Sequence, residues 1–398
     1  MNKKQDKKLF YQRKNFWKEA APSTINKAFA FAEPYMDFLN QAKTVREAVA
    51  YTEALLKEHK FQSIGGKKGS RRLYQIFRGK TIAMAVLGSE PLSEGFNMVA
   101  SHIDAPRVDL KQNPFYEDSS SGMACMRTHY YGGIKKYQWV STPLALHGIV
   151  IRANGSKIDV SIGEKDDEPV FIIPDLLPHL ARKEQYSKNL ADAIDASRMN
   201  LVFSGMMEPA SEEKEAIKAY TLQLLKKQLK MEESDFISAE LELVPATKAR
   251  HSGFDSSMVV GYGQDDRVCA YAALRGLLDN LDGTPKRTMI VYFSDKEEVG
   301  SQGNTGAHSV FIQDFVAALL RANGESDSSA NLRKTFINSQ ILSGDVTAAV
   351  DPNYPGVHER QNAVLFNHGV GLCKFTGSGG KAGCNDANAE FTAKVIRI

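Results

Sequence analysis

The sequence predicts an α/β protein. Its first domain has a mixed sheet, and a second, β-rich domain is inserted into it. From about residue 245 onward, helical and strand patterns alternate, which is typical of a sheet with crossover helices. Between residues 111 and 244, strand patterns with hairpin turns dominate instead. A length of 398 residues favours about two domains, so we expect 1–110 and 245–398 to form one domain and 111–244 the other.

The first domain is predicted to begin with a helix and then strands. Residues 42–57 carry apolar side chains at helical spacing, and Thr44 with Glu47 has the pattern of a capping box. Apolar runs on both sides of Gly79 predict a hairpin, and a further run predicts a strand that ends at His102. The strands are expected at 73–77, 81–87 and 96–102.

The inserted segment has its own strand pattern. Residues 139–152 and 157–162 lie on either side of Asn154-Gly155, a two-residue signal for a hairpin turn. A charged, Leu-rich stretch at 212–231 predicts a helix, and alternation at 236–244 predicts an edge or half-buried strand. These features are consistent with a separate, β-rich unit.

The C-terminal part returns to the α/β pattern. We expect helices at 268–281 and 307–323, a strand at 288–293 and a short strand at 344–350. In open α/β sheets, polar residues at strand ends converge at one edge, where ligands usually bind. Side chains that follow these strands are therefore the first candidates for a functional site.

Composition excludes several classes of protein. The 50 basic and 47 acidic residues leave a net charge of +3, so no global field favours nucleic acid or membranes as partners. Seven basic residues among the first eighteen predict a solvated helix rather than a targeting signal, since no apolar core accompanies them. No segment approaches the roughly 20 apolar residues that cross a bilayer.

The cysteine pattern predicts a location and a ligand type. The four cysteines form no C-x-x-C pair, which suits reduced thiols in a cytoplasmic protein and argues against zinc held by thiolates. They are Cys125, Cys269, Cys373 and Cys384.

Ligand-type side chains follow several predicted strands. A histidine and carboxylates in such positions suggest a metal site, because zinc accepts imidazole nitrogen and carboxylate oxygen. Two metals can activate water and polarise a peptide carbonyl, and a free carboxylate can move the proton. Asp265 is the candidate carboxylate that bridges the two metals. The candidates are His102, Asp104, Asp265, Asp266, Glu297, Glu298 and Asp345.

Taken singly, each candidate has another interpretation. His102 could be a hydrogen-bonded structural residue, and Asp265-Asp266 could cap the helix that begins near Val268. Glu297-Glu298 could form a solvated turn, and Asp345 could be a turn former. The hypothesis of a site rests on the joint pattern.

Longer strings carry a more specific signal. In order along nearly the whole chain, they resemble the aspartyl aminopeptidase family, the eighteenth metallopeptidase family, in its bacterial branch. The strings are SHIDAPRVDL from Ser101, THYYGGIKKYQW from Thr128, QDDRVCAYA from Gln264, SDKEEVGS from Ser294 and DVTAAVDPNY from Asp345.

The resemblance implies a dinuclear zinc aminopeptidase that acts on peptides, and it leaves open a preference for acidic N-terminal residues. His102, Asp265 and Asp345 match the ligands of one zinc, while Asp265 and Glu298 match ligands of the second. Glu297 matches the general base, which moves a proton from water to the leaving amine. By the same resemblance, Asp104 hydrogen-bonds His102 and orients its ring.

Other implied features concern assembly and substrate. Residues 111–244 match an inserted dimerisation domain of a family whose members form dodecamers. His179 matches, more loosely, a histidine that a neighbouring subunit presents to the substrate carbonyl. Lys381 is a candidate for reading an acidic substrate side chain, with a solvated loop lysine as the alternative.

The chain also departs from the family pattern. Family members continue beyond the position of Ile398 and supply a histidine that completes the second zinc site. We therefore expect a C-terminally truncated form whose second site and activity are impaired. The alternatives are a catalytically silent assembly subunit and a related dinuclear zinc exopeptidase or deacylase.

Overall fold

The computed structural model describes residues 9–66, 69–375 and 387–398. The chain divides into two compact units. One unit comprises Met1–Phe31 with Thr347–Ile398, and the other is Ala32–Val346. The second unit contains two six-stranded sheets. These sheets, together with the helices that pack on them, confirm the predicted α/β fold class.

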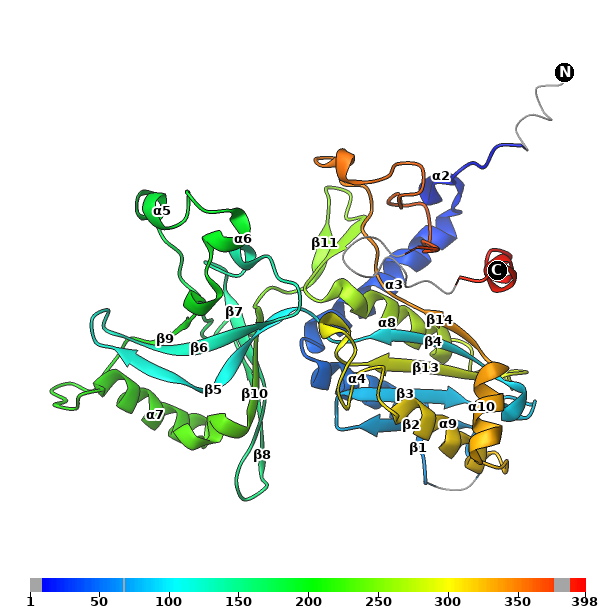
Figure 1. The fold of residues 1–398 in the computed structure, drawn as a ribbon, viewed down its shortest axis with the longest axis horizontal. Helices are drawn as coiled ribbons and strands as arrows, with labels where there is room; N and C mark the ends of the chain where they lie inside the picture. Colours follow the sequence, from blue (N-terminus) through cyan, green and yellow to red (C-terminus); the bar gives the residue numbers. More distant parts are fainter. Residues whose placement is uncertain (1–8, 67–68, 376–386) are drawn as a thin grey trace. The chain divides into compact units, whose positions relative to one another are not determined.

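The first sheet has the strand order β1-β2-β3-β13-β4-β14 (Figure 1). Strands β13, β4 and β14 run parallel to one another, whereas β3 is antiparallel to both β2 and β13. The sheet is therefore mixed, as predicted. Its strands are β1 Gln62–Ser63, β2 Arg72–Phe77, β3 Thr81–Val86, β4 Phe96–His102, β13 Thr288–Ser294 and β14 Gln340–Ser343.

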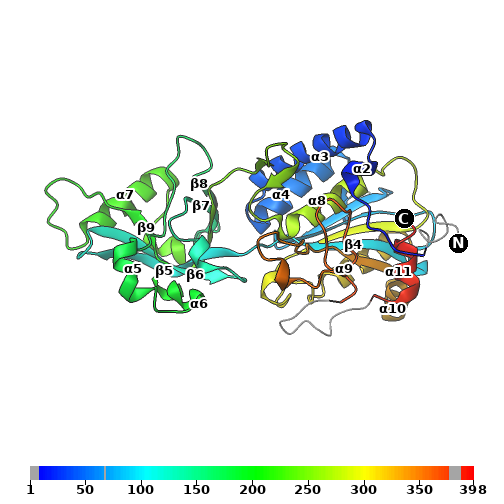
Figure 2. The same cartoon turned by 90° about the horizontal axis from the view of Figure 1, so that it is seen from above.

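Alternating side chains of this sheet fill two cores. In β3, Ile82 and Met84 join one apolar cluster while Ala83 and Ala85 join another. Successive residues of a strand point to opposite faces, so a strand that is apolar throughout must be covered on both sides. Helices lie on both sides of the sheet in Figure 2. One face packs on α3 (Pro22–Gln41), α4 (Val45–Glu58) and α8 (Gln264–Leu278), and the other on α9 (Phe311–Ala322) and α10 (Ser329–Ile337).

The start of α4 confirms the predicted capping box. The Thr44 hydroxyl accepts from the Glu47 amide at 3.3 Å, and the Glu47 carboxylate accepts from the Thr44 amide at 2.8 Å. These bonds satisfy backbone donors that no helical carbonyl can reach.

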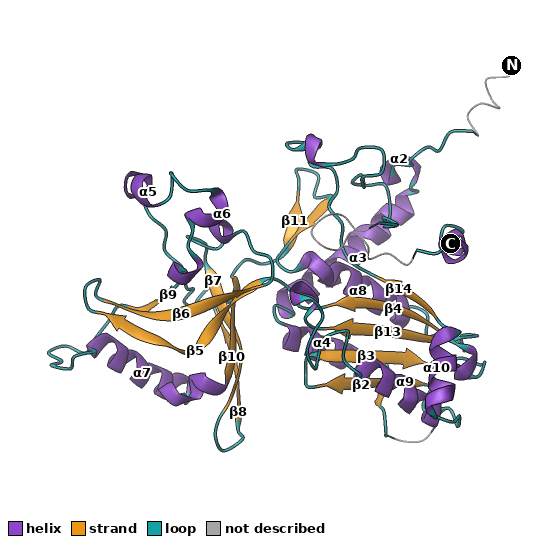
Figure 3. Ribbon diagram, viewed as in Figure 1, coloured by secondary structure: helices purple, strands orange, loops and turns teal. Residues whose placement is uncertain are grey.

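The second sheet has the order β8-β7-β10-β5-β6-β9, and Figure 3 shows it beside α7 (Ala216–Leu229). The Asn154-Gly155 turn joins β7 to β8 as predicted, and the Asn154 side chain accepts from the Ser156 amide at 2.9 Å. The strands are β5 Arg107–Asp118, β6 Met123–Tyr131, β7 Leu144–Ile151, β8 Lys157–Ile162, β9 Leu201–Ser204 and β10 Ala239–Pro245.

Two predicted strands are misplaced. Residues 233–238 form a 3-10 turn, and the strand after them, β10, is central rather than at an edge because β7 and β5 pair with it on either side. The strand expected at 344–350 ends before Gly344, whose amide donates to the Ala100 carbonyl at 2.7 Å. A Cβ at Gly344 would lie 2.9 Å from Ser101 Oγ and 3.2 Å from Cys269 Cβ, so there is little room for a side chain there.

The remaining described elements are short. No helix among the described residues is both long enough and apolar enough to span a bilayer. Within the unit that holds both termini, the Val350 amide donates to the Val364 carbonyl at 3.0 Å. The short elements are α2 Phe16–Glu19, α5 Pro178–Glu184, α6 Leu190–Ala193, β11 Arg250–Ser252, β12 Met258–Val260 and α11 Ala389–Val395.

A buried ion cluster ties α4 to the second sheet. His147 of β7 lies between two carboxylates, with Nδ1 2.8 Å from Glu47 and Nε2 3.0 Å from Glu164. The Lys43 ammonium lies 3.6 Å from Glu164. Burial disfavours the imidazolium, but the hydrogen bonds with Glu164 and Glu47 outweigh it and raise the pKa of His147 to about 9.

This cluster predicts a pH dependence of stability. The folded pKa of His147 lies above the ordinary value of 6.5, so its contribution is fully present below about pH 6.5 and is lost as pH rises through about 9. Urea unfolding, followed by circular dichroism at pH 6 and pH 9.5, should show a smaller pH effect in His147→Gln than in the wild type. His129→Gln, an exposed histidine on β6, is the control, and equal pH effects in both variants would contradict the prediction.

Candidate metal centre

The candidate side chains meet at the carboxyl ends of parallel strands. Strand β4 ends at His102, which pairs in register with Ser294 at the end of β13. Strand β14 pairs with β4 from the other side and ends two residues before Asp345. Because parallel strands end at one edge of a sheet, three segments distant in sequence deliver ligand-type groups to one place.

Three of the predicted ligands form a compact group. Ligand atoms of His102, Asp265 and Asp345 all lie within 4.8 Å of one another. His102 Nε2 is 3.1 Å from Asp265 Oδ1 and 3.9 Å from Asp345 Oδ1. The histidine side chain is 3% exposed, whereas those of Asp265 and Asp345 are 51% and 53% exposed. The group is thus anchored in the protein on one side and open to solvent on the other.

Asp265 reaches this group from the start of α8. The N-cap of the helix is Gly263, whose φ of 74° is left-handed, and no side chain caps the helix there. Asp265 and Asp266 interrupt the helix, Asp265 contacts His102, and the Asp266 carboxylate accepts from no backbone amide of the described residues, so the interpretation of this pair as a cap is wrong. Both residues have non-helical backbone angles, and the peptide bond between them is cis. Asp265 lies beside His102, while Asp266 is fully buried.

Asp104 lies directly behind the histidine. It is fully buried, and its Oδ1 is 3.2 Å from His102 Nδ1. The same carboxylate accepts from the Glu297 amide at 3.1 Å and from the Glu298 amide at 3.2 Å. It also accepts from the Tyr131 hydroxyl at 2.8 Å. Asp104 therefore links the histidine with the loop that bears the two glutamates.

That loop places the two glutamates at the site. Residues Glu297–Val299 form a 3-10 turn after β13, between Lys296 and Gly300, both of which have left-handed φ. Glu297 Oε2 is 3.9 Å from His102 Nε2. The Glu298 side chain packs closely on Gly132, where an added Cβ would lie 3.2 Å from the Glu298 Cβ. The solvated-turn interpretation of this pair is therefore wrong.

The electrostatics of the cluster favour a bound cation. Burial, together with Asp265, raises the pKa of Glu298 to about 7, and burial also raises the pKa of Asp345. Burial opposes the imidazolium of His102, but hydrogen bonds with Asp104 and Asp265 raise its pKa to about 11. In each case the carboxylates crowd one another and attract positive charge. A metal ion supplies that charge without a proton.

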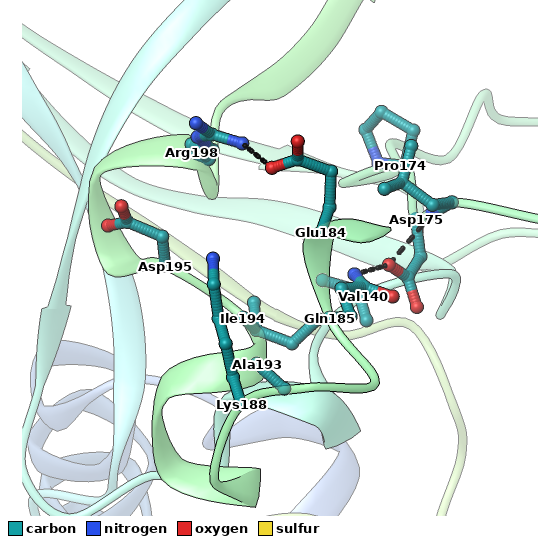
Figure 4. A pocket seen from close by; sticks show the side chains of 11 residues that line it. Val140, Pro174, Asp175, Glu184, Gln185, Lys188, Ala193, Ile194, Asp195 and Arg198 are labelled. Atoms are coloured by element: carbon teal, nitrogen blue, oxygen red, sulfur yellow. Dashed lines mark hydrogen bonds and ion pairs between the residues drawn. The ribbon is translucent and has the colours of Figure 1, made fainter. Parts of the chain in front are cut away.

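Two further predicted site residues do not join this group. His179 lies exposed on α5 of the inserted segment. A hollow of about 240 Å³ in this segment is lined by Glu184, Lys188 and Arg198 among others, but not by His179 (Figure 4). Charged groups that line the hollow pair with one another, as Glu184 does with Arg198 at 3.3 Å. Lys381 lies outside the described residues.

Comparison with known proteins places this geometry in a family. A family model described as "Aminopeptidase I zinc metalloprotease (M18)" matches residues 38–396. The chain belongs to the M18 family. It is accordingly a hydrolase, an M18 aminopeptidase in a family of zinc metalloproteases.

Bacterial M18 proteins share both sequence and fold with the chain. It is 42% identical over 398 residues to a probable M18 family aminopeptidase 1 of Clostridium acetobutylicum, covering 98% of this chain and 84% of that relative. The crystal structure of an M18 aminopeptidase from Thermotoga maritima superimposes with a TM-score of 0.90 at 40% identity, over 98% of this chain and 84% of that one.

More distant proteins resemble the chain in sequence or in fold. An aspartyl aminopeptidase of Caenorhabditis elegans is 27% identical over 374 residues, 89% of this chain and 77% of the relative. The structure of an S. cerevisiae mApe1 dodecamer matches with a TM-score of 0.66 at 22% identity, over 84% of this chain and 75% of that one.

Tyr131 is the contact that sequence reasoning missed. It belongs to the string that begins at Thr128, which pointed to the family but suggested no role for any single residue. Only the pairing of β5 with β6 brings its hydroxyl to Asp104.

Loss of one carboxylate should weaken metal binding. Asp345→Asn removes a negatively charged ligand while keeping the shape of the side chain. Loss of a residue that only hydrogen-bonds a ligand lowers metal affinity by about 10–100-fold, so we expect a larger fall in zinc affinity here. Competition with a chromophoric chelator measures it. Asp351→Asn, at an exposed position, is the control, and equal affinities in both variants would contradict the prediction.

Proposed function

We propose that this M18 aminopeptidase holds zinc with His102, Asp265 and Asp345 and removes N-terminal residues from peptides. The observation that supports this proposal most directly is that these three side chains converge, with Glu297 Oε2 only 3.9 Å from His102 Nε2. One imidazole nitrogen and carboxylate oxygens form a donor set that suits zinc. Bound zinc supplies a Lewis acid for water and for the peptide carbonyl.

The residues around the metal ligands have separate tasks in this proposal. Glu297 acts as general base and carries a proton from water to the leaving amine, a role that requires a carboxylate near the reacting water. Asp104 holds His102 Nδ1 through its backbone carbonyl at 3.0 Å and its carboxylate at 3.2 Å, and so directs Nε2 toward the open side of the site. We assign Glu298, together with Asp265, to a second zinc.

The half-exposed carboxylates give the substrate its approach. Asp265 and Asp345 present their open sides to solvent, so a peptide can reach the site without displacing buried side chains. We propose peptides with free N-termini as substrates, in a cytoplasmic setting. Rates on otherwise identical Asp, Glu and Leu anilides decide whether acidic residues are preferred, and Lys381 is the candidate reader.

Replacement of the general base tests the mechanism. Glu297→Gln keeps the size of the side chain but removes its basicity, so we expect kcat on aminoacyl anilides to fall by about 10²–10⁴-fold. Zinc content, measured by atomic emission, should stay unchanged because Glu297 is not a proposed ligand. Glu94→Gln, an exposed glutamate before β4, is the control.

The outcomes separate the candidate functions. Ordinary turnover in Glu297→Gln would refute the role of that residue. Wild-type protein that binds zinc and assembles but hydrolyses no anilide would favour a silent assembly subunit. Activity confined to N-terminally blocked substrates would favour a related exopeptidase or deacylase.

We also propose that the inserted segment mediates assembly into a homo-oligomer. The part of the inserted segment around α5 and α6 exposes several large apolar side chains close together in sequence. Single exposed apolar residues are ordinary on a protein surface, but a group of them is typical of an interface. His179 belongs to the same stretch of sequence, 176–190, so an interface at this surface would bring the histidine near a neighbouring subunit. The members of this apolar surface are Leu176, Leu177, Leu180, Tyr186 and Leu190, which are 40%, 67%, 62%, 64% and 67% exposed.

A charged double substitution tests this surface. Leu177→Asp with Leu180→Asp places two charges in the apolar surface, so we expect a smaller particle by multi-angle light scattering, because buried charge is costly at an interface. Ile337→Asp is the control, since Ile337 is 82% exposed on α10. An unchanged particle mass in the double variant would contradict the assignment.

A further inference from the structure

The string that begins at Thr128 includes a turn that contacts the loop bearing Glu297 and Glu298. Tyr131 is the last residue of β6, and Gly132 follows it with a left-handed φ of 71°. Tyr131 donates its hydroxyl to Asp104 Oδ2 at 2.8 Å. None of the roles proposed above for the metal ligands or the general base involves these two residues.

The groups around the Asp104 carboxylate are evenly divided between its oxygens. Oδ1 accepts from the Glu297 amide at 3.1 Å and lies 3.2 Å from His102 Nδ1, whose shorter contact, at 3.0 Å, is with the Asp104 backbone carbonyl. Oδ2 accepts from the Tyr131 hydroxyl at 2.8 Å and from the Glu298 amide at 3.2 Å. A fully buried carboxylate needs such donors, because its charge has no water to stabilise it. Loss of one donor would therefore leave the buried charge less stabilised and would change how the carboxylate holds its other partners.

Tyr131 is the one of these four groups that comes from the second sheet. The other three belong to β4 or to the loop after β13. The hydroxyl therefore couples the position of β6 to the position of the loop that carries Glu297.

The tyrosine ring is itself held in place. The Arg107 guanidinium lies 3.8 Å from its centroid, in register with Tyr131 on the neighbouring strand β5. Arg107 Nε in turn lies 2.8 Å from Asp109 and 3.1 Å from Glu242. Because these partners belong to β5 and β10, the direction of the hydroxyl is set by the second sheet.

Gly132 acts on the same loop by close packing. A Cβ at this position would lie 3.2 Å from the Glu298 Cβ and 3.4 Å from its Oε2. The turn thus meets the loop in three ways: through the hydroxyl and Asp104, through the Glu298 side chain, and through the Lys296 ammonium, which lies 5.5 Å from the centroid of the Tyr131 ring.

We propose that the Tyr131-Gly132 turn positions His102 and the Glu297-Glu298 loop for hydrolysis, with Asp104 as the shared acceptor. Tyr131 is a positioning residue that touches neither substrate nor metal. The inference rests on the proposed function, since it assigns a support to the general base and to a metal ligand of that site.

The decisive variant is Tyr131→Phe, which removes only the hydroxyl. We expect kcat on a Leu anilide to fall by about 10–100-fold with little change in KM, because positioning affects the reacting groups more than binding. We also expect the zinc affinity of the apoprotein, measured by chelator competition, to fall by about tenfold, because His102 loses part of its support.

A matched control comes from the neighbouring sheet. Tyr292 on β13 is also buried, and its hydroxyl has no hydrogen-bond partner within the described part of the chain. Tyr292→Phe should therefore leave kcat and zinc affinity at wild-type values. Equal kcat and equal zinc affinity in the Tyr131→Phe and Tyr292→Phe proteins would overturn the proposal.

A pair of glycine variants tests the turn without the hydroxyl. Gly132→Ala should lower kcat, since the added methyl meets Glu298, whereas Gly133→Ala should not, since nothing lies within 4 Å of a Cβ there. Equal kcat in these two variants would also count against the proposal. Should wild-type protein bind zinc but hydrolyse nothing, the proposed function fails, while the zinc affinities still decide the role of Tyr131.

Discussion

The structure of the site depends on one buried carboxylate. Asp104 has no exposed surface, and burial alone would raise its pKa. Hydrogen bonds with His102 and Tyr131 outweigh that effect and hold its pKa below the ordinary value. The ionised carboxylate can therefore accept from the Tyr131 hydroxyl and the Glu297 and Glu298 amides, while the His102 ring lies 3.2 Å from it and 3.0 Å from the Asp104 carbonyl. A single negative charge thus orders the histidine ligand and the proposed general base together.

The strand arrangement explains why this charge lies where it does. Strand β4 leaves the first sheet at His102, and β5 of the second sheet begins at Arg107, only a few residues later. The connection between the sheets therefore passes directly behind the metal ligands. Strand β10 returns from the second sheet ahead of Asp265, so both connections lie close to the site in sequence. Contacts such as those of His147 and Tyr131 follow from this short coupling.

Local signals predicted most elements of the fold. The capping box at Thr44 and the Asn154-Gly155 turn depend on residues close in sequence, so both predictions are confirmed. The strand expected at 344–350 is wrong, since the strand lies at 340–343, where it pairs with residues 97–100 far away along the chain. Of the two alternatives for 236–244, the half-buried strand is confirmed by β10 and the edge strand is not, because an alternating pattern does not reveal how many neighbours a strand has.

The sequence by itself determined the chemistry available to this protein. It supplied a histidine and carboxylates after apolar strands, and strings specific enough to indicate the M18 family, which the comparisons then confirmed. Only the tertiary structure decided which of those groups meet. His102, Asp265 and Asp345 converge because parallel strands end at a common edge, and Tyr131 reaches Asp104 because β6 pairs with β5. Such distances are set by strand pairing between remote segments, which no local pattern of residues encodes.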